Sequence, residues 1–368
     1  MTDKPPISKF ISRVLVRNLT LIIFVSLLIV FRYFTTRPIY KNGDTVRITA
    51  TILTDPVSYP GSQGLKVAGL TVYLPTFPEV SYGDGIVVEG IVDEGKLKNA
   101  KLISVSGNRS FGSFARNKII FFYQKVLPQP MSGLTAGITL GSKGTLTSDF
   151  WNRVKFTGVA HVVVASGTNV TFVVSFLMGV LTLILPRKKA ILFVIVGIIL
   201  YLFLSGFDAP LVRAAIMAVL TFWAVETGRL VDAWRVLLLT GGIMLIIQPD
   251  WLGDIGFALS FVSTASIMLL EKRIAKWLRP VPGVLREGLS TSLAAQVGVA
   301  PILFVTFGRF NIWSPIINAL VLWTIPYIMV LGSVGGVVGL MFPFLGKMIL
   351  WLSYPLNWWF VKVVYLFG

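Results

Sequence analysis

The sequence predicts a polytopic α-helical membrane protein with a small all-β domain inserted outside the membrane. Hydrophobic residues make up 55% of the chain and charged residues only 13%, which is about half the charged fraction of a soluble domain. Apolar runs long enough to cross a bilayer follow one another through residues 159–368. A different pattern, the period-two alternation of strands, occupies residues 36–110.

The N-terminal segment has the charge pattern of a membrane anchor. Lys4, Lys9, Arg13 and Arg17 precede an apolar run at 19–31. Residues 32–38 lack the small-residue pattern of a cleavage site. We therefore expect residues 1–35 to be an uncleaved transmembrane anchor and not a cleaved signal sequence.

Residues 36–110 alternate apolar and polar positions, with Gly-Asp and Glu-Gly pairs between the runs. Val46, Ile48 and Ala50, for example, share one face of a predicted strand. This pattern predicts short strands joined by hairpins. About five strands in about 70 residues favour a small closed barrel of the OB type, with a plain sandwich as the alternative.

Residues 111–158 connect the two parts. Aromatic residues alternate with Arg116, Lys118 and Lys125 over 113–128, which predicts an amphipathic helix lying on the membrane. Residues 131–158 are too polar to span, and we expect them at the surface or as a re-entrant segment. Beyond them we predict spans near 160–185, 190–206, 211–228, 234–249, 252–270, 287–307, 315–341 and 346–366.

The distribution of charge orients these spans. Lys and Arg gather in the loops at 186–189, 226–235 and 271–279, whereas the opposite loops carry Asp208, Asp250 and Asp254. The positive-inside rule then places the N-terminus in the cytoplasm and the β domain outside the membrane. We find no internal repeat, which disfavours a carrier.

The predicted exterior is basic. Residues 37–155 contain fourteen Lys and Arg against eight Asp and Glu, within a chain of net charge +17. Such a surface suits a polyanion, or contacts anionic lipid headgroups. The candidate contacts for single-stranded nucleic acid are Lys66, Lys96, Lys98 and Lys101, with Tyr59, Tyr73 and Tyr82 offering rings on which bases stack. Those tyrosines are as compatible with core packing or membrane-interface anchoring.

A polar interruption at 157–176 carries the strongest functional signal. His161, the only histidine, is followed by Ser166, Gly167, Thr168 and Asn169 in an otherwise apolar run. Polar groups in hydrocarbon usually line a cavity or a path, because each needs a partner or water. The alternatives are a histidine bonded to a neighbouring carbonyl and a small-residue stretch that allows close helix packing.

Three further polar residues lie within predicted spans. Arg213 either forms an ion pair with Asp208 or Asp254 or contacts phosphate in a channel. Gln296 and Asn318 either line a wet pore or form hydrogen bonds between helices.

Several chemistries are disfavoured. The chain has no cysteine and one histidine, which argues against disulfides, thiolate catalysis and a multi-histidine metal centre. The sequence GSKGT at 141–145 lacks the spacing of a phosphate-binding loop. Ser166 and His161 would point to different helix faces, with no acidic partner evident. We expect no enzymatic activity, no metal and no cofactor.

The polar interruption resembles the signature of ComEC-type competence proteins. The matching positions are Thr157, Gly158, Ala160, His161, Ser166, Gly167 and Val170. Asn169 stands where the family has a second histidine, and Thr168 where it has leucine.

Other segments resemble the same family in the same order. They are residues 136–158, residues 209–218 with Arg213, residues 256–270 with Ala258 in place of the usual glutamine, and residues 294–320 with Gln296, Pro301, Phe307, Gly308, Phe310 and Asn318. The resemblance covers about residues 130–340.

The resemblance implies a channel in the inner membrane of a bacterial cell that takes up single-stranded DNA during natural transformation. Many family members carry a further metallo-β-lactamase-like domain, whereas these 368 residues contain no His-x-His-x-Asp-His run. We therefore expect a membrane-core form that works in the bilayer with a separate nuclease, a cytoplasmic ATPase or helicase motor, and a DNA receptor or pilus machinery. The alternatives are a permease for a small anionic solute and an accessory anchor for a partner nuclease.

Overall fold

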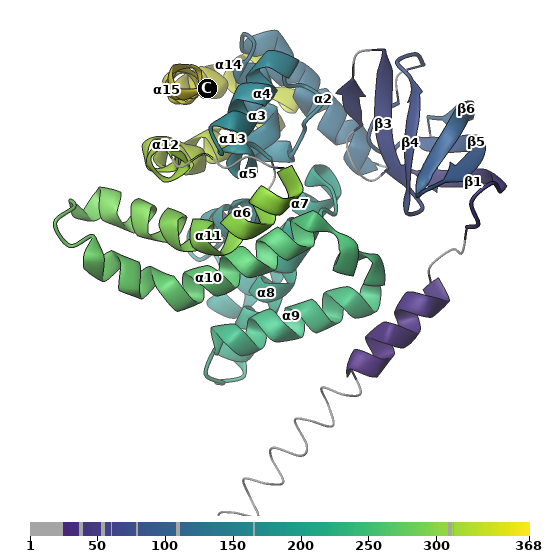
Figure 1. Ribbon diagram of the computed structural model, residues 1–368. Helices are drawn as coiled ribbons and strands as arrows, with labels where there is room; N and C mark the ends of the chain where they lie inside the picture. The colour runs from purple at the N-terminus through teal and green to yellow at the C-terminus, as the bar shows by residue number, and fades with distance from the viewer. Residues whose placement is uncertain are drawn as a thin grey trace, which may run out of the picture.

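The computed structural model describes residues 25–36, 40–52, 56–59, 61–78, 80–107, 111–164, 166–307, 311 and 313–368. Most of the predicted N-terminal anchor thus lies outside the described residues, as do Gly308 and Phe310. Within the described part, an apolar helix covers Val25–Thr36. It is followed by a β-sheet at one side of a larger helical body (Figure 1).

The sheet has six strands in the order β1-β5-β6-β4-β3-β2. Their bounds are β1 Thr45–Thr51, β2 Val57–Tyr59, β3 Ser62–Val67, β4 Leu70–Pro75, β5 Gly85–Asp93 and β6 Lys96–Ser106. All pairs are antiparallel except a short parallel pairing of β4 with β6, Thr71 with Lys96 and Val72 with Leu97. Two hairpins turn through residue pairs with positive φ, Ala68-Gly69 and Glu94-Gly95, as two-residue type I′ turns require.

The strand order corrects the expected closed barrel. Strands β1 and β2 stand at the two ends of the sheet and do not pair with each other in the described residues. The apolar-polar alternation nevertheless predicted which face of the strands is buried. Residues from four strands share one apolar core: Ile48, Val72, Val88 and Leu97. Alternation defines which face is buried, but closure depends on the pairing of distant strands, which alternation leaves open.

The sheet is fixed to the helical body by polar contacts at one helix end. Arg116, only 2% exposed, donates from Nη1 to the carbonyl of Leu204 at 2.8 Å. Its guanidinium also lies 4.6 Å from the ring centre of Tyr82. The Tyr82 hydroxyl donates to the carbonyl of Phe203 at 3.4 Å. A cation among the last carbonyls of a helix is favourable, because those carbonyls carry the negative end of the helix dipole.

The helical body comprises fourteen α-helices among the residues described. They are α2 Phe111–Val126, α3 Met131–Leu140, α4 Ser148–Phe156, α5 Ala160–Val163, α6 Gly167–Leu181, α7 Arg187–Ser205, α8 Ala209–Glu226, α9 Ala233–Ile247, α10 Ile255–Trp277, α11 Gly283–Phe307, α12 Ser314–Val321, α13 Ile325–Met341, α14 Pro343–Leu352 and α15 Tyr354–Phe367. In Figure 1, α8 to α11 lie together on one side and α12 to α15 near α3 and α4 on the other.

Five helical segments are long and apolar enough to cross a membrane, by length and composition. They are Arg187–Ser205, Ala209–Glu226, Ile255–Trp277, Arg286–Thr306 and Ser314–Met341. These correspond to five of the eight predicted spans after the β domain. The other three are shorter or broken: 160–185 divides into α5 and α6, α9 has 15 residues, and 346–366 divides into α14 and α15 at Ser353.

Helix α3 is the centre of the body and not a surface piece. All ten of its residues are buried, and α2, α13 and α15 pack against it. The surface placement considered for residues 131–158 is therefore wrong for α3. A short helix at this depth is compatible with the re-entrant alternative, because its ends can be satisfied by surrounding protein.

Candidate functional site

The polar interruption noted in the sequence is a break in the helical chain. Helix α4 ends at Phe156, and Gly158 turns the backbone at φ +76°. The four-residue α5 follows, and Ser166 is extended at φ −117° and ψ 166° before α6 begins at Gly167. The helical chain is therefore broken at Ser166, within the polar interruption of the sequence, and the backbone groups freed by the break need partners.

His161 contacts the turn from inside the break. Its Nδ1 lies 3.0 Å from the carbonyl oxygen of Gly158, while the ring as a whole is exposed. This contact matches the alternative given above, a histidine bonded to a neighbouring carbonyl. Whether the exposed ring also faces a transport path stays a prediction.

The turn is held from the other side by the segment that precedes α12. Asn311 donates from Nδ2 to the carbonyl of Phe156 at 2.9 Å. A Cβ added to Gly158 would lie 2.3 Å from Oγ of Ser314. The turn therefore fits against α12 only because residue 158 is glycine.

Gln296 and Asn318 belong to this same contact region. Gln296 on α11 donates to the carbonyl of Asn311 at 3.3 Å, and Asn318 on α12 donates to Oγ of Ser292 at 3.2 Å. The bond of Asn318 joins two helices, which is the second of the two roles foreseen for these residues, whereas the bond of Gln296 joins α11 to the segment before α12. The amide oxygens of Gln296 and Asn318 are buried and have no hydrogen-bond partner among the described residues, so each retains an acceptor for water or a passing donor.

On the α6 side of the break, Asn169 is fully buried. It donates from Nδ2 to the carbonyl of Ile138 at 2.8 Å, and its Oδ1 accepts from Oγ of Ser166 at 3.3 Å. These bonds tie the start of α6 to the central helix α3. Asn169 stands where the family has a second histidine. Its amide group bonds both the carbonyl of Ile138 and the hydroxyl of Ser166, the residue just before α6.

Arg213 on α8 lies beside the first residue of α6. Its Nη2 is 2.9 Å from the position that a Cβ on Gly167 would take. The guanidinium donates from Nε to Oγ of Ser260 at 2.7 Å and lies 5.9 Å from the ring centre of Phe261. Gly167 thus gives the cation access to the N-terminal end of α6.

The ion pairs considered for Arg213 do not form in the described part of the chain. Asp208 lies 3.9 Å from Nζ of Lys143 instead. The carboxylate of Asp254 accepts from the backbone N–H of Phe257 at 2.9 Å and so caps α10. Arg213 therefore brings a positive charge, without a carboxylate, to the interface of α6, α8 and α10.

The sequence did not indicate three residues that contact this region. Asn311 and Ser314 contact the turn at 156–158, and Ser260 accepts the hydrogen bond of Arg213. A signal existed, since each is a polar residue within an apolar or aromatic stretch.

The basic residues of the sheet are partly brought together. Lys96, Lys98 and Lys101 are exposed along β6, and Tyr73 is 45% exposed on β4. Lys98 also forms an ion pair with Asp93 across the hairpin. Tyr82 is buried against Arg116 and is not available for stacking. The side chains of Tyr59 and Lys66 lie outside the described part of the structure.

Fold and site together define a multi-span helical membrane protein with a broken, polar-lined segment and a β domain that carries exposed lysines along β6. The family model for Competence protein matches residues 138–368, and the chain belongs to that family.

Two curated relatives are similar to more than half of this chain. ComE operon protein 3 of Bacillus subtilis (strain 168) is 28% identical over 228 residues, which cover 60% of this chain and 28% of that protein. Competence protein ComA of Neisseria gonorrhoeae is 25% identical over 218 residues, covering 55% of this chain and 30% of that protein. The alignments thus span less than a third of each relative. No solved structure matches the chain.

Proposed function

We propose that this chain is a conduit in the cell membrane through which single-stranded DNA enters the cytoplasm during natural transformation. Membership of the Competence protein family supports a role in competence. The step from competence to a channel rests on the arrangement of charge in this chain.

The proposed route begins at the exposed lysines of β6. Lys96, Lys98 and Lys101 lie in a row on one strand, which suits the regularly spaced phosphates of a nucleic-acid strand. The β domain contacts the C-terminal end of α7 through Tyr82 at Phe203, whereas Arg187, Lys188 and Lys189 lie at the N-terminal end of α7. The positive-inside rule puts that basic end in the cytoplasm and hence the sheet outside, where incoming DNA arrives.

The single observation that carries the proposal is that Arg213 lies in an apolar span without a carboxylate partner among the described residues. A charged residue in a span is costly, by about 2.5–3.5 kcal/mol on insertion scales, and usually marks an ion or substrate pathway. Here the described residues supply no carboxylate for it, and its neighbours are a serine, a methionine and the first turn of α6. A phosphate passing the break would meet both the guanidinium and the free N–H groups of α6.

The proposal needs partners. We propose a transport role without catalysis, with a separate nuclease to degrade one strand, a cytoplasmic ATPase or helicase to draw the other inward, and a DNA receptor or pilus to deliver it.

The test uses chromosomal variants of the native host and labelled DNA. Arg213→Gln, with protein level in the membrane verified, should leave surface-bound DNA unchanged and reduce DNase-resistant internal DNA by about tenfold or more, since one lost hydrogen bond to a charged phosphate corresponds to about 1.5–3 kcal/mol. Arg213→Lys, which keeps the charge, should retain part of the uptake. Wild-type uptake in Arg213→Gln would overturn the proposal.

The same arginine also suits a permease for a small anionic solute. Liposomes containing the purified chain separate the two functions when they are offered labelled oligothymidylate or small organic anions. Entry of the small anions alone supports the permease. Entry of neither, combined with loss of a partner nuclease from the membrane in deletion cells, supports an accessory anchor.

A further inference from the structure

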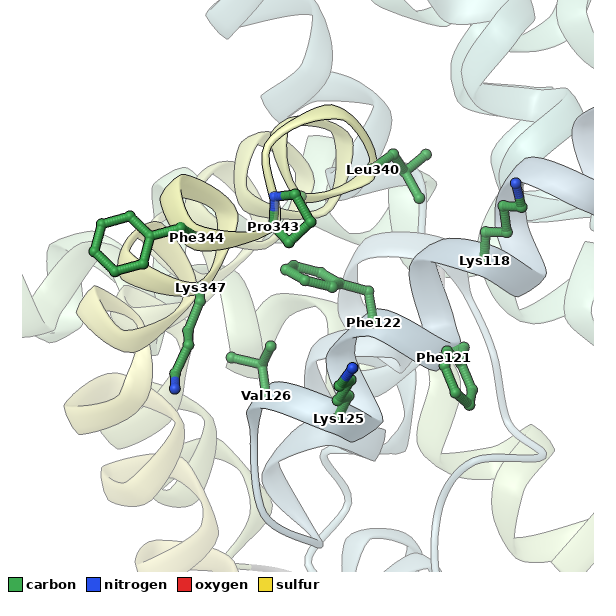
Figure 2. A pocket seen from close by; sticks show the side chains of 10 residues that line it. Lys118, Phe121, Phe122, Lys125, Val126, Leu340, Pro343, Phe344 and Lys347 are labelled. Atoms are coloured by element: carbon green, nitrogen blue, oxygen red, sulfur yellow. The ribbon is translucent and has the colours of Figure 1, made fainter.

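A groove of about 500 Å³ lies between α2, the end of α13 and α14, away from the broken segment. Its floor is apolar and includes Phe121, Phe122, Leu340 and Phe344. Figure 2 shows Phe122 directed across the groove toward Pro343, with Lys125 and Lys347 on one side of it and Lys118 farther along α2. The groove therefore combines an apolar floor with a basic rim.

The charge of the rim is not neutralised by its own lining. Three lysines line the groove, and its lining includes no acidic residue. Helices α2 and α14 also have no acidic residue in their first turns. Lys118 lies over the ring of Phe114, with Nζ 4.3 Å from the ring centre, so its ammonium is held along the same helix surface. The lining of the groove is thus positively charged and favours an anionic ligand over a cationic one.

The shape of the groove results from glycines at the contact of α13 with its neighbours. A Cβ on Gly339 would lie 2.1 Å from the ring of Phe122, and one on Gly346 would lie 2.3 Å from the Cα of Gly339. Helix α14 can therefore approach α13 closely, and the ring of Phe122 occupies the space beside Gly339 that a side chain would fill. The floor is a fixed part of the fold and not a gap between loose helices.

The groove lies at the end of a membrane-spanning segment. The apolar segment Ser314–Met341 ends where α14 begins. Phe121 and Phe344 are 68% and 73% exposed, and the neighbouring Met341 is 74% exposed. Large apolar side chains next to the end of a span, with lysines beside them, are the arrangement expected at the level where acyl chains meet headgroups.

We infer that this groove binds one anionic phospholipid, with its phosphate between Lys125 and Lys347 and an acyl chain along Phe121, Phe122 and Phe344. A nucleic-acid strand offers the same phosphate chemistry. It fits less well, because the floor is continuous with the exposed apolar surface of Leu340 and Met341, which hydrocarbon covers. The inference is independent of the proposed DNA path, since it uses none of its residues.

The test exploits the absence of cysteine from this chain. Phe344→Cys provides a unique attachment point for a fluorophore on the 368-residue chain in nanodiscs. Phosphatidylglycerol with a nitroxide on its acyl chain should quench the label at a low mole fraction. Phosphatidylcholine carrying the same nitroxide should need a severalfold higher fraction.

The second arm removes the charge. Lys125→Gln with Lys347→Gln should raise the half-quenching fraction of phosphatidylglycerol by about 25-fold, since each lysine near a membrane surface contributes about fivefold. Both side chains are exposed, so the fold is not at risk. Lys98→Gln with Lys101→Gln, an equal loss of charge on the sheet, should leave quenching unchanged.

Two results would overturn the inference. One is equal quenching by the two lipids, or no effect of the groove substitutions. The other is displacement of nitroxide phosphatidylglycerol by oligothymidylate at an unchanged lipid composition, which would assign the groove to nucleic acid.

Discussion

At the scale of single residues, the candidate site depends on glycines as much as on polar groups. Gly158 allows the turn before α5 to contact Ser314, and Gly167 allows Arg213 to approach the start of α6. Neither role follows from the residue type alone. The sequence indicates that a helix breaks in this region, but it does not indicate which distant side chain occupies the space beside each glycine.

The contact at Gly158 makes a prediction with two separable parts. Gly158→Ala places a methyl group 2.3 Å from Oγ of Ser314, and it also imposes a side chain at φ +76°. We expect a loss of stability with a conformational part of about 1–2 kcal/mol and an additional steric part. Thermal unfolding in detergent measures the total.

The double variant separates the two parts. Ser314→Gly removes the clashing hydroxyl, so Gly158→Ala in that background should regain the steric part and keep the conformational one. Complete rescue would show that the backbone tolerates alanine at this φ, and no rescue would show that Ser314 is not the obstacle.

Asn169 allows a second test at the same scale. Asn169→Asp keeps the size of the side chain but removes the donor to the carbonyl of Ile138. An unsatisfied buried carbonyl costs about 1–3 kcal/mol, and a buried carboxylate adds to that cost. We expect a lower unfolding temperature, which rises as the pH is lowered enough to protonate the carboxyl. A pH-independent loss would contradict this account.

At the scale of elements, the sequence best predicts properties that depend on one helix or strand by itself, and not on how distant elements pack together. Five of the predicted spans match segments long and apolar enough to cross a membrane, because length and composition are local properties. The break at 157–170 was also predictable, because glycine and small polar residues there weaken a helix locally. Closure of the sheet and burial of α3 were not, because both depend on which distant elements pack together.

The packing of α13 against α14 makes a prediction of this kind. Gly346→Ala would place Cβ 2.3 Å from the Cα and 2.6 Å from the N of Gly339, and backbone atoms cannot move aside as a flexible side chain can. We expect a loss of about 1–3 kcal/mol, typical of overpacking, with α14 displaced. Gly288→Ala on α11, where nothing lies within 4 Å, is the matched control and should be neutral or stabilising. Equal behaviour of the two variants would contradict the close contact.

At the scale of the whole molecule, the sequence defined two parts but not their junction. The change from period-two alternation to long apolar runs separates sheet from helices. However, nothing in the pattern assigned Tyr82 and Arg116 to each other or to α7. Arg116 was expected on the membrane surface with Lys118 and Lys125, and its burial is a tertiary effect that the local amphipathic pattern does not reveal.

This junction positions the lysines of β6 relative to the spans and can be tested separately from either part. Arg116→Ala removes the bond to Leu204 and the cation over Tyr82, while the apolar core of the sheet, which does not include Arg116, remains. We expect faster hydrogen exchange at the end of α7 and around Tyr82, with core strands β5 and β6 unchanged. Arg47→Ala, an exposed arginine on β1, removes the same charge and should change neither region. Faster exchange throughout the sheet in Arg116→Ala would mean that the sheet needs the helical body to fold. In that case the sheet and the spans would form one cooperative unit, and the basic face could not move relative to the path it is proposed to serve.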